Sequence, residues 1–162
     1  MQLNQLNKTS SAVAKRIIKE LSSMRVGTLG VITEQNTVHL SAVYYSLAED
    51  FVISFATKAN TKKHQLLQKN GNVQLLVFDE AKQLTIQITG IAHQVSDTTL
   101  ENQIIDNAYW IAARTADEAP PIAKIHAGEF VAYQILPMRI TMSHFLPEED
   151  ADYATFESLD FA

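Results

Sequence analysis

The chain has 162 residues and a mass of 18.1 kDa, with 46% hydrophobic residues, 19% charged residues and a mean hydropathy of -0.05. This length and composition fit one folded domain and exclude a disordered chain, a collagen-like chain and a long coiled coil. The chain has no cysteine, which excludes disulfides, thiolate metal sites and cysteine nucleophiles.

The net charge of -5 is unevenly distributed along the chain. Residues 148–162 hold six of the 18 acidic residues and no Lys or Arg, which leaves 12 acids against 13 bases in residues 1–147. We expect one domain over residues 1–147 and an acidic tail over 148–162. Apolar residues from Tyr153 to Phe161 predict that this tail packs on the body, or on a partner subunit, as a short helix or turn.

No apolar run approaches the roughly 18 residues that a membrane-spanning helix needs. Residues 1–18 also lack the apolar stretch and the small-residue cleavage site of an export signal. The sequence therefore predicts a soluble cytoplasmic protein with no membrane partner.

The first expected element is a helix over residues 10–24, because apolar residues recur at helical spacing from Val13 to Met24. Three strands are expected next, over residues 26–33, 37–47 and 51–57, because these segments are rich in β-branched and aromatic residues. Short polar turns separate them, which favours antiparallel hairpins over parallel units with crossover helices.

Asn60 is expected to cap a short helix that stops at Gly71. Strands follow over residues 73–79 and 83–95, and strict alternation of apolar and polar residues marks the second as half-buried. A second long helix is expected to begin after a cap at Ser96 or Asp97 and to run to about Arg114.

The last two expected strands cover residues 128–136 and 138–145, split by Pro137. Together these elements predict about seven antiparallel strands, with helices at the start of the chain, after the third strand and after the fifth strand. Closing such a sheet removes its edges, so the predicted fold is mainly β, a small barrel with peripheral helices.

The usual catalytic motifs are missing from the sequence. It has no GxGxxG, no GxxxxGK[ST], no HExxH and no GxSxG. No two of the five histidines lie at metal-ligand spacing on one helix, so we expect no metal site. The apolar helical neighbours of Trp110 favour packing in the core or at an interface over stacking on a cofactor.

Residues 51–78 contain four lysines and no acidic residue. That excess is too small for a duplex nucleic-acid surface, but it suits one small anion. Lys62 and Lys63 fall in the first turn of the expected short helix, where free N–H groups and the helix dipole already favour an anion. With a hydroxyl from Thr57 or Thr61, this combination suits a phosphate group. The alternative is a helix end whose lysines point into water.

The order of motifs from residue 26 to residue 95 resembles the pyridoxamine 5′-phosphate oxidase-like family, the FMN-binding split barrels. The similar features are a TLG first strand, Thr61-Lys62-Lys63 opening a helix, an LQKNGNV step over residues 67–73 and a QITGIA strand over residues 87–92. FVAYQILPMRI, over residues 130–140, is similar to the closing strands of that family.

The resemblance implies a split β-barrel that binds FMN in sites formed between two subunits of a homodimer. Matching positions imply a phosphate site at Thr61, Lys62 and Lys63 and a ribityl contact at the strand end. The implied cofactor-binding residues are Ser41, Ala42, Val43, Ala56, Thr57, Thr61, Lys62, Lys63 and Gln87.

The sequence departs from the vitamin-processing oxidases of that family at three places. Ser41 stands where they usually have an arginine, and Ser46 where they have a lysine near the substrate. Their arginine-rich C-terminal signature has no counterpart in residues 132–153. The resemblance therefore implies an FMN-binding relative with another, unknown small-molecule substrate.

Three functions are compatible with these observations. The first is an FMN-dependent oxidoreductase, in which the flavin supplies the hydride chemistry and no catalytic side chain can be named. The second is a non-catalytic protein that holds flavin or haem, where His126 or His144 would matter for haem. The third is an interaction domain with an empty barrel and solvated lysines.

Overall fold

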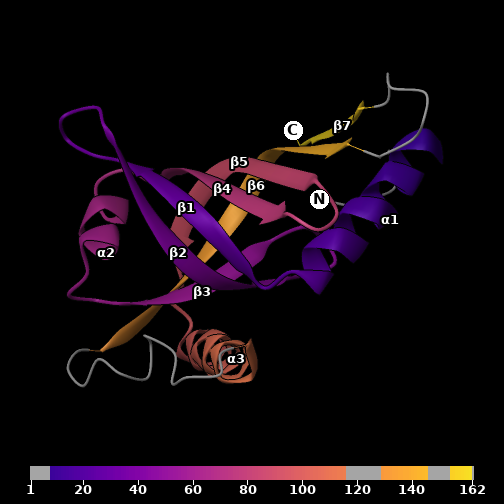
Figure 1. Ribbon diagram of the computed structural model, residues 1–162. Coiled ribbons are helices and arrows are strands. Elements are labelled where there is room, and N and C mark those ends of the chain that lie inside the picture. Colours follow the sequence, from indigo (N-terminus) through magenta and orange to yellow (C-terminus); the bar gives the residue numbers. More distant parts are fainter. Residues whose placement is uncertain (1–7, 116–128, 146–153, 162) are drawn as a thin grey trace.

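The computed structural model describes residues 8–115, 129–145 and 154–161 of the protein (Figure 1). The described elements in chain order are α1 (Lys8–Ser23), β1 (Val26–Ile32), β2 (Val38–Leu47), β3 (Ile53–Lys58), α2 (Lys62–Leu67), β4 (Asn72–Asp79), β5 (Leu84–Gln94), α3 (Thr98–Thr115), β6 (Phe130–Phe145) and β7 (Ala154–Asp160). The strands form one antiparallel sheet in the order β3-β2-β1-β4-β5-β6-β7. An additional pairing of β3 with β6 closes six of them into a barrel, which confirms the predicted fold.

The alternation predicted for β5 appears as burial in the structure. Leu84, Ile86 and Ile88 are buried inside the barrel, whereas Gln87 and Thr89 face outward and are exposed. β1 and β4 alternate in the same way, whereas all six residues of β3 are buried. The inward residues of the barrel strands fill one continuous core. Because the barrel interior is packed with side chains, any ligand site must lie on its outside or at its ends.

The three helices of the described residues lie on different sides of the barrel. Figure 1 shows α1 and α2 at opposite ends and α3 against a third side. The hydroxyl of the buried Tyr45 donates a hydrogen bond of 2.9 Å to the Leu21 carbonyl and so ties α1 to β2. Asp97 caps α3, since its Oδ1 accepts from the Leu100 N–H at 2.7 Å.

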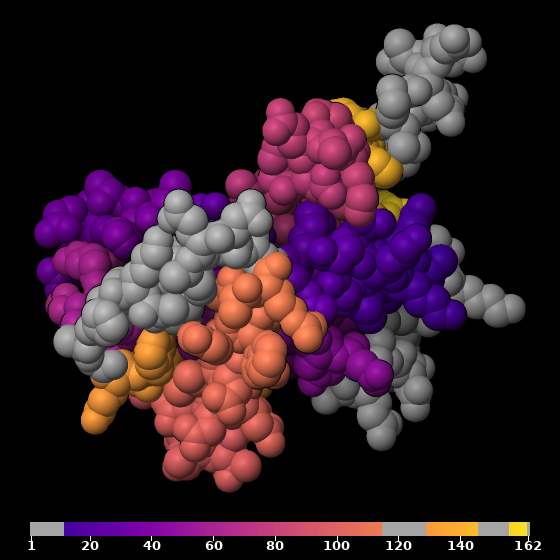
Figure 2. Space-filling view, turned by 60° about the horizontal axis from the view of Figure 1, so that its bottom comes forward, coloured from indigo at the N-terminus to yellow at the C-terminus, as the bar shows by residue number. Residues whose placement is uncertain are grey.

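Trp110 lies on the outer side of α3 and is 62% exposed, so the prediction that it packs in the core is wrong. Figure 2, which turns this side of the molecule forward, shows α3 in salmon and orange at the front of the molecule. The Arg114 guanidinium lies 5.5 Å from the centre of the Trp110 ring, a cation–π contact on an exposed helix face. Packing of Trp110 at an interface stays a prediction.

Pro137 does not split the last barrel strand as the sequence predicted, because β6 runs continuously from Phe130 to Phe145. The β5–β6 register shifts at this point: Thr89 pairs with Arg139, but Gly90 pairs with Pro137. One extra residue on β6, Met138, is accommodated as a bulge, and a strand can pass through a proline at such a bulge. A Cβ on Gly90 would lie 2.4 Å from the Leu136 carbonyl oxygen, so the close approach needs glycine.

Residues 154–160 of the acidic tail form β7, which pairs antiparallel with the second half of β6. Leu159 is buried, and the Phe161 ring packs edge-on against Phe51 with 5.4 Å between centroids. The tail therefore packs on the body as expected, but as a strand and not as a helix or turn. Backbone pairing explains this, because the second half of β6 would otherwise present an open edge. The domain boundary predicted at residue 147 lies outside the described residues.

We expect Leu159→Ala to lower the free energy of unfolding by about 2–3 kcal/mol, because it leaves a cavity beneath β7. Ser158→Ala, one residue away on the exposed side of the same strand, should change it by less than about 0.5 kcal/mol. Urea unfolding of both variants measures the difference. Equal stability of the two variants would show that β7 contributes no packing energy.

Candidate functional site

The junction between β3 and α2 is organised around the Thr61 side chain. Thr61 is the N-cap of α2, and its Oγ1 accepts from the His64 N–H at 3.3 Å. The prediction that Asn60 caps this helix is therefore wrong by one residue. A threonine here accepts from the first turn and also holds the preceding strand, since its hydroxyl donates to the Lys58 carbonyl at 2.8 Å.

The hydroxyl protons of Thr57 and Thr61 are both engaged within this junction. The two Oγ1 atoms lie 3.1 Å apart, and the single Thr61 proton goes to the Lys58 carbonyl. Thr57 must therefore donate to Thr61, because each hydroxyl carries only one proton. Thr61 thus positions the junction, and Thr57 is the hydroxyl that can turn toward a ligand at the cost of one hydrogen bond.

Lys63 is the unusual charge of the junction, because only 9% of its surface is exposed. Its Nζ lies 5.8 Å from the centre of the buried Phe55 ring. No carboxylate of the described residues forms an ion pair with it. Burial lowers the pKa of Lys63 from 10.5 to about 8, since desolvation disfavours the ammonium form. This arrangement leaves a buried cation without a counter-charge, which an anionic ligand would supply.

Lys62 differs from Lys63, since it is exposed to solvent at the start of α2. The helix itself has only six residues, so the lysines, and not an extended helix dipole, provide the positive charge here. Lys58 is a second buried lysine, with its Nζ 5.2 Å from the centre of the Phe130 ring. The sequence did not single out Lys58, because nothing in its own segment shows that Phe130 pairs with it across β3 and β6.

A hydrogen-bonded network that the sequence analysis missed fixes the orientation of α2. The Tyr133 hydroxyl of β6 lies 2.9 Å from His64 Nδ1 and accepts from Gln68 Nε2, also at 2.9 Å. Gln68 Nε2 also donates to Gln94 Oε1 at 2.6 Å. The Tyr133 ring stacks on Phe55, the ring that faces Lys63. The network therefore connects the position of Lys63 to the barrel wall.

The predicted contacts on β2 and β3 alternate between the two faces of the sheet. Val43 is buried inside the barrel and Ala42 is exposed outside it. The Ser41 Oγ is buried and has no hydrogen-bond partner in the described part of the chain. Ala56 is buried on the side covered by α3, where its strand partner Ala132 packs against Val95 and Ile104. Ala56 and Ala42 can therefore contribute little more than backbone and methyl groups to a site.

These β2 residues and the β3–α2 junction lie at one corner of the barrel. β2 and β3 pair through Tyr45 and Phe55, so Val43 and Thr57 lie two residues further along, at the same end of the pair. The structure therefore places the predicted residues of β2, β3 and α2 at one end of the β2–β3 pair, with those of β2 and β3 on both faces of the sheet.

Gln87 lies apart from that corner, on the outer side of β5. It pairs with Leu76 of β4, which pairs with Thr28 of β1, which pairs with Ala42 of β2. Two strands thus separate Gln87 from β2, a lateral distance of roughly 14 Å at the usual strand spacing. The predicted set consists of two groups, and a single chain does not bring them into one pocket.

Gln87 belongs to an outward surface that is largely apolar, which we call the outer apolar face. Its large hydrophobic side chains are each between 36% and 63% exposed and are Val26, Ile32, Val38, Leu40, Leu76, Phe78 and Ile91. They lie on the adjacent strands β2, β1, β4 and β5. Contiguous apolar surface of this extent is typical of an interaction site.

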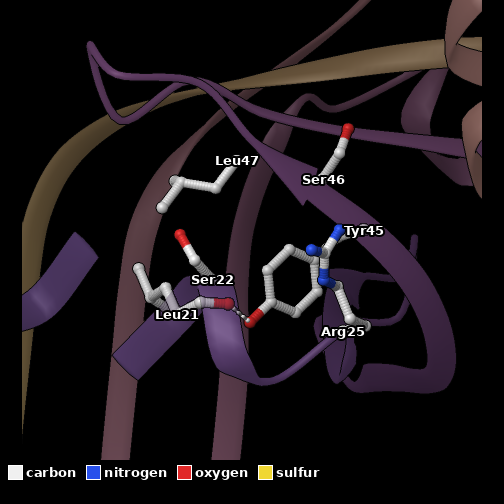
Figure 3. A pocket seen from close by; sticks show the side chains of 6 residues that line it. All are labelled: Leu21, Ser22, Arg25, Tyr45, Ser46 and Leu47. Atoms are coloured by element: carbon white, nitrogen blue, oxygen red, sulfur yellow. Dashed lines mark hydrogen bonds between the residues drawn. The ribbon is translucent and has the colours of Figure 1, made fainter. Parts of the chain in front are cut away.

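A pocket between α1 and β2 has a volume of about 70 Å³ and is lined by Leu21, Ser22, Arg25, Tyr45, Ser46 and Leu47. Figure 3 shows the Arg25 side chain alongside the Tyr45 ring, with the Tyr45 hydroxyl bonded to the Leu21 carbonyl. This volume is far below the roughly 300 Å³ of a usual small-molecule site. The pocket is therefore too small for a flavin ring.

Two further features are absent from residues 8–115, 129–145 and 154–161. No group of three or more His, Asp or Glu side chains there could hold a metal ion. None of the helices in the same residues is long and apolar enough to cross a membrane. His126 lies outside the described residues, and His144 is half-buried on β6.

Comparison with known proteins identifies the fold. No protein-family model matches the chain, and no curated protein matches its sequence. Solved structures do match. A protein of Clostridium acetobutylicum related to general stress protein 26, of the pyridoxinephosphate oxidase family, is 12% identical with a TM-score of 0.66, covering 92% of this chain and 94% of that one.

Two other similar structures differ in the ligand that they are named for. A pyridoxamine 5′-phosphate oxidase-related, FMN-binding protein of Nostoc punctiforme is 10% identical with a TM-score of 0.56, covering 98% of both chains. A heme-binding protein of Mycobacterium smegmatis is 14% identical with a TM-score of 0.66, covering 91% of this chain but only 57% of that one. The chain thus has the split-barrel fold of the pyridoxamine 5′-phosphate oxidase-like proteins, as the resemblance implied.

We expect Lys63→Met to stabilise the ligand-free protein by about 1–3 kcal/mol at pH 7, because it removes a buried charge that no carboxylate of the described residues neutralises. The Lys63 pKa is lowered by folding, so the penalty is complete below about pH 8 and disappears as the pH rises toward 10.5. The advantage of the variant should therefore fade over this range. Urea unfolding at pH 7 and pH 10 measures it, with Lys62→Met as the exposed control. An unstabilised Lys63→Met at pH 7 would contradict the assignment.

Proposed function

We propose that this protein binds FMN at the corner formed by β2, β3 and α2, as a flavoprotein of the pyridoxamine 5′-phosphate oxidase-like family. One observation carries the proposal: Lys63, at the position implied for phosphate contact, is a buried cation that no described carboxylate neutralises. A phosphate monoester would neutralise that charge and accept hydrogen bonds from it. The FMN-binding neighbour of the same fold supports the choice of ligand.

Four residues at this corner would each contribute to phosphate binding in a different way. Lys63 provides the desolvated charge, and Thr57 can redirect its hydroxyl from Thr61 to a phosphate oxygen. Thr61 keeps α2 in place through its cap and its bond to Lys58. Lys62 stays hydrated and acts mainly by attracting the anion.

The activity that we propose is that of an FMN-dependent oxidoreductase, since a bound flavin supplies hydride chemistry that this chain's own side chains do not. The protein's part would be to bind and orient the ring and to exclude water from it. Ser41 and Ser46 replace the basic residues of the vitamin-processing oxidases, so the substrate we propose is a small molecule other than pyridoxamine phosphate.

We also propose that the protein is a homodimer whose cofactor sites lie at the subunit interface. Gln87 and the phosphate corner are separated within one chain, and the outer apolar face that carries Gln87 is uncovered. A second copy that packs on this face would cover the apolar side chains and bring its own Gln87 to a flavin held at the corner. The same contact would enclose the ring that a single chain leaves open to water.

Haem is the alternative ligand, because a heme-binding protein shares the fold. The buried Lys63 suits either anion, the FMN phosphate or a haem propionate, so we base the preference for FMN on the Thr57 hydroxyl beside it, which suits a phosphate. A protein that gives a Soret band with hemin and takes up no FMN would decide for haem.

The phosphate assignment predicts that Lys63→Met weakens FMN binding by about ten- to a hundredfold, as expected for a lost charge-assisted contact. Riboflavin lacks the phosphate, so its affinity should change by less than about twofold. Lys62→Ala should lose only about two- to fivefold for FMN, because its ammonium stays in water. Fluorescence titration of apo-protein with both flavins measures these ratios, and salt should weaken FMN more than riboflavin. Equal losses for the two flavins would remove the phosphate contact.

The dimer proposal predicts a mass of about twice 18.1 kDa by size-exclusion chromatography with light scattering. Leu40→Asp places a charge on the outer apolar face and should give a monomer that binds FMN at least about tenfold more weakly. Gln103→Asp, which adds the same charge to an exposed position of α3, should remain dimeric. A wild-type monomer at micromolar concentration would refute the proposal.

A further inference from the structure

Gln74 contacts Gln87 on the outer apolar face and is not one of the predicted cofactor-binding residues. Gln74 of β4 pairs with Thr89 and Leu76 pairs with Gln87, so the two glutamines are diagonal neighbours on one face. Gln74 Nε2 donates a hydrogen bond to Gln87 Oε1 at 3.3 Å. Both residues are exposed, so this face presents their amides to whatever covers it.

This hydrogen bond determines which end of the Gln87 amide faces a ligand. A glutamine amide has one oxygen that accepts and one NH2 group that donates. The Gln87 oxygen is turned toward Gln74, so its NH2 group points the other way and stays available. A ligand that meets Gln87 therefore meets hydrogen-bond donors.

The charges around Gln87 reinforce this polarity. Arg139 pairs with Thr89 and lies on β6 two residues from Thr141, the direct partner of Gln87. Arg139 Nη1 lies 3.6 Å from Asp160 Oδ1, and both side chains are more than half exposed. Such a pair is weak and leaves the guanidinium free to face a ligand. Beside the Asp160 carboxylate, this part of the face thus presents two donor groups, the Gln87 NH2 group and the Arg139 guanidinium.

We propose that Gln74 is a positioning residue, which holds the Gln87 amide with its NH2 group toward the ligand. The site then selects acceptor atoms that stay acceptors on reduction, which in FMN are the ring carbonyl oxygens and not its N3–H. This inference rests on the proposed binding of FMN at the interface of a homodimer. A donor to a ring carbonyl favours the reduced flavin, because reduction increases the electron density on that oxygen, so Gln74 helps to set the reduction potential.

Gln74→Glu tests the inference, because a carboxylate can only accept. It would draw the Gln87 NH2 group toward itself and turn the Gln87 oxygen to the flavin. The new charge also acts on the flavin directly. The substitution is therefore made both in the wild-type protein and in the Gln87→Met variant. The difference between the potential shifts in these two backgrounds isolates the part of the effect that depends on Gln87. Gln103→Glu on α3 controls for the added charge at a distance.

The measurement is the midpoint potential of FMN bound to the reconstituted protein. We expect Gln74→Glu to lower the affinity for reduced relative to oxidised FMN about tenfold more when Gln87 is present. For a two-electron couple this is a potential lower by about 30 mV. The infrared stretches of the flavin carbonyls should shift in Gln74→Glu and not in Gln103→Glu.

The outcomes separate this inference from the proposed function. Equal potential shifts with and without Gln87 would overturn the role of Gln74 while leaving FMN binding intact. A wild-type protein that takes up no FMN would overturn both the proposed function and the role of Gln74. A flavin that binds with normal affinity but is indifferent to Gln87→Met would place the ring elsewhere and also overturn the inference.

Discussion

The bulge between Gly90 and Pro137 is the constraint on which the rest of the barrel depends. β6 has sixteen residues and pairs with three strands, with β3 through its first half, with β7 through its second half and with β5 along both. A straight strand could not turn from one partner to the next, and a bulge bends and twists a strand locally. Gly90 permits the close approach to Leu136, and the Met138 carbonyl accepts from the Phe161 N–H at 2.9 Å. The residues that look like strand breakers thus close the barrel and attach the tail.

Local patterns predicted most of the fold, and the errors fall where partners far along the chain decide. The alternation in β5 and the helical spacing in α1 depend only on neighbouring residues, so these elements could be predicted. The sequence predicted a strand break at Pro137, because the Gly90 that accommodates this proline lies on another strand. The strand β7 was missed because acidic residues hide its alternation, and only the open edge of β6 makes it a strand. Asn60 and Thr61 are both good caps, and the bond of Thr61 to Lys58 decides between them.

The candidate site was predictable as a set of residue positions but not as a geometry. Thr57, Thr61 and Lys63 could be chosen from the sequence because they lie within seven residues and carry chemistry that suits a phosphate. Their hydrogen bonds could not be predicted from the sequence, which does not show that the hydroxyl protons of Thr57 and Thr61 are both already donated. Gln74 and Tyr133 act through cross-strand and helix–strand contacts, which no local pattern shows. The nearest signal for Gln74 was its place as an outward polar residue on a strand whose outward neighbours are Leu76 and Phe78.

Two unfavourable features of the single chain have a common remedy in the proposed arrangement. The buried Lys63 is paired with no carboxylate of the described residues, and the outer face exposes large apolar side chains. FMN would supply the missing anion, and a second copy would cover the apolar face and the ring together. Because one flavin would then touch both copies, its binding and the association of the chains must strengthen each other by the same factor. The FMN affinity should then rise with protein concentration until the dimer is complete, and the dimer should persist to lower concentration when FMN is present. Two independent surfaces would show neither effect, so this mutual dependence is what distinguishes a shared site from a dimer that happens to bind a flavin.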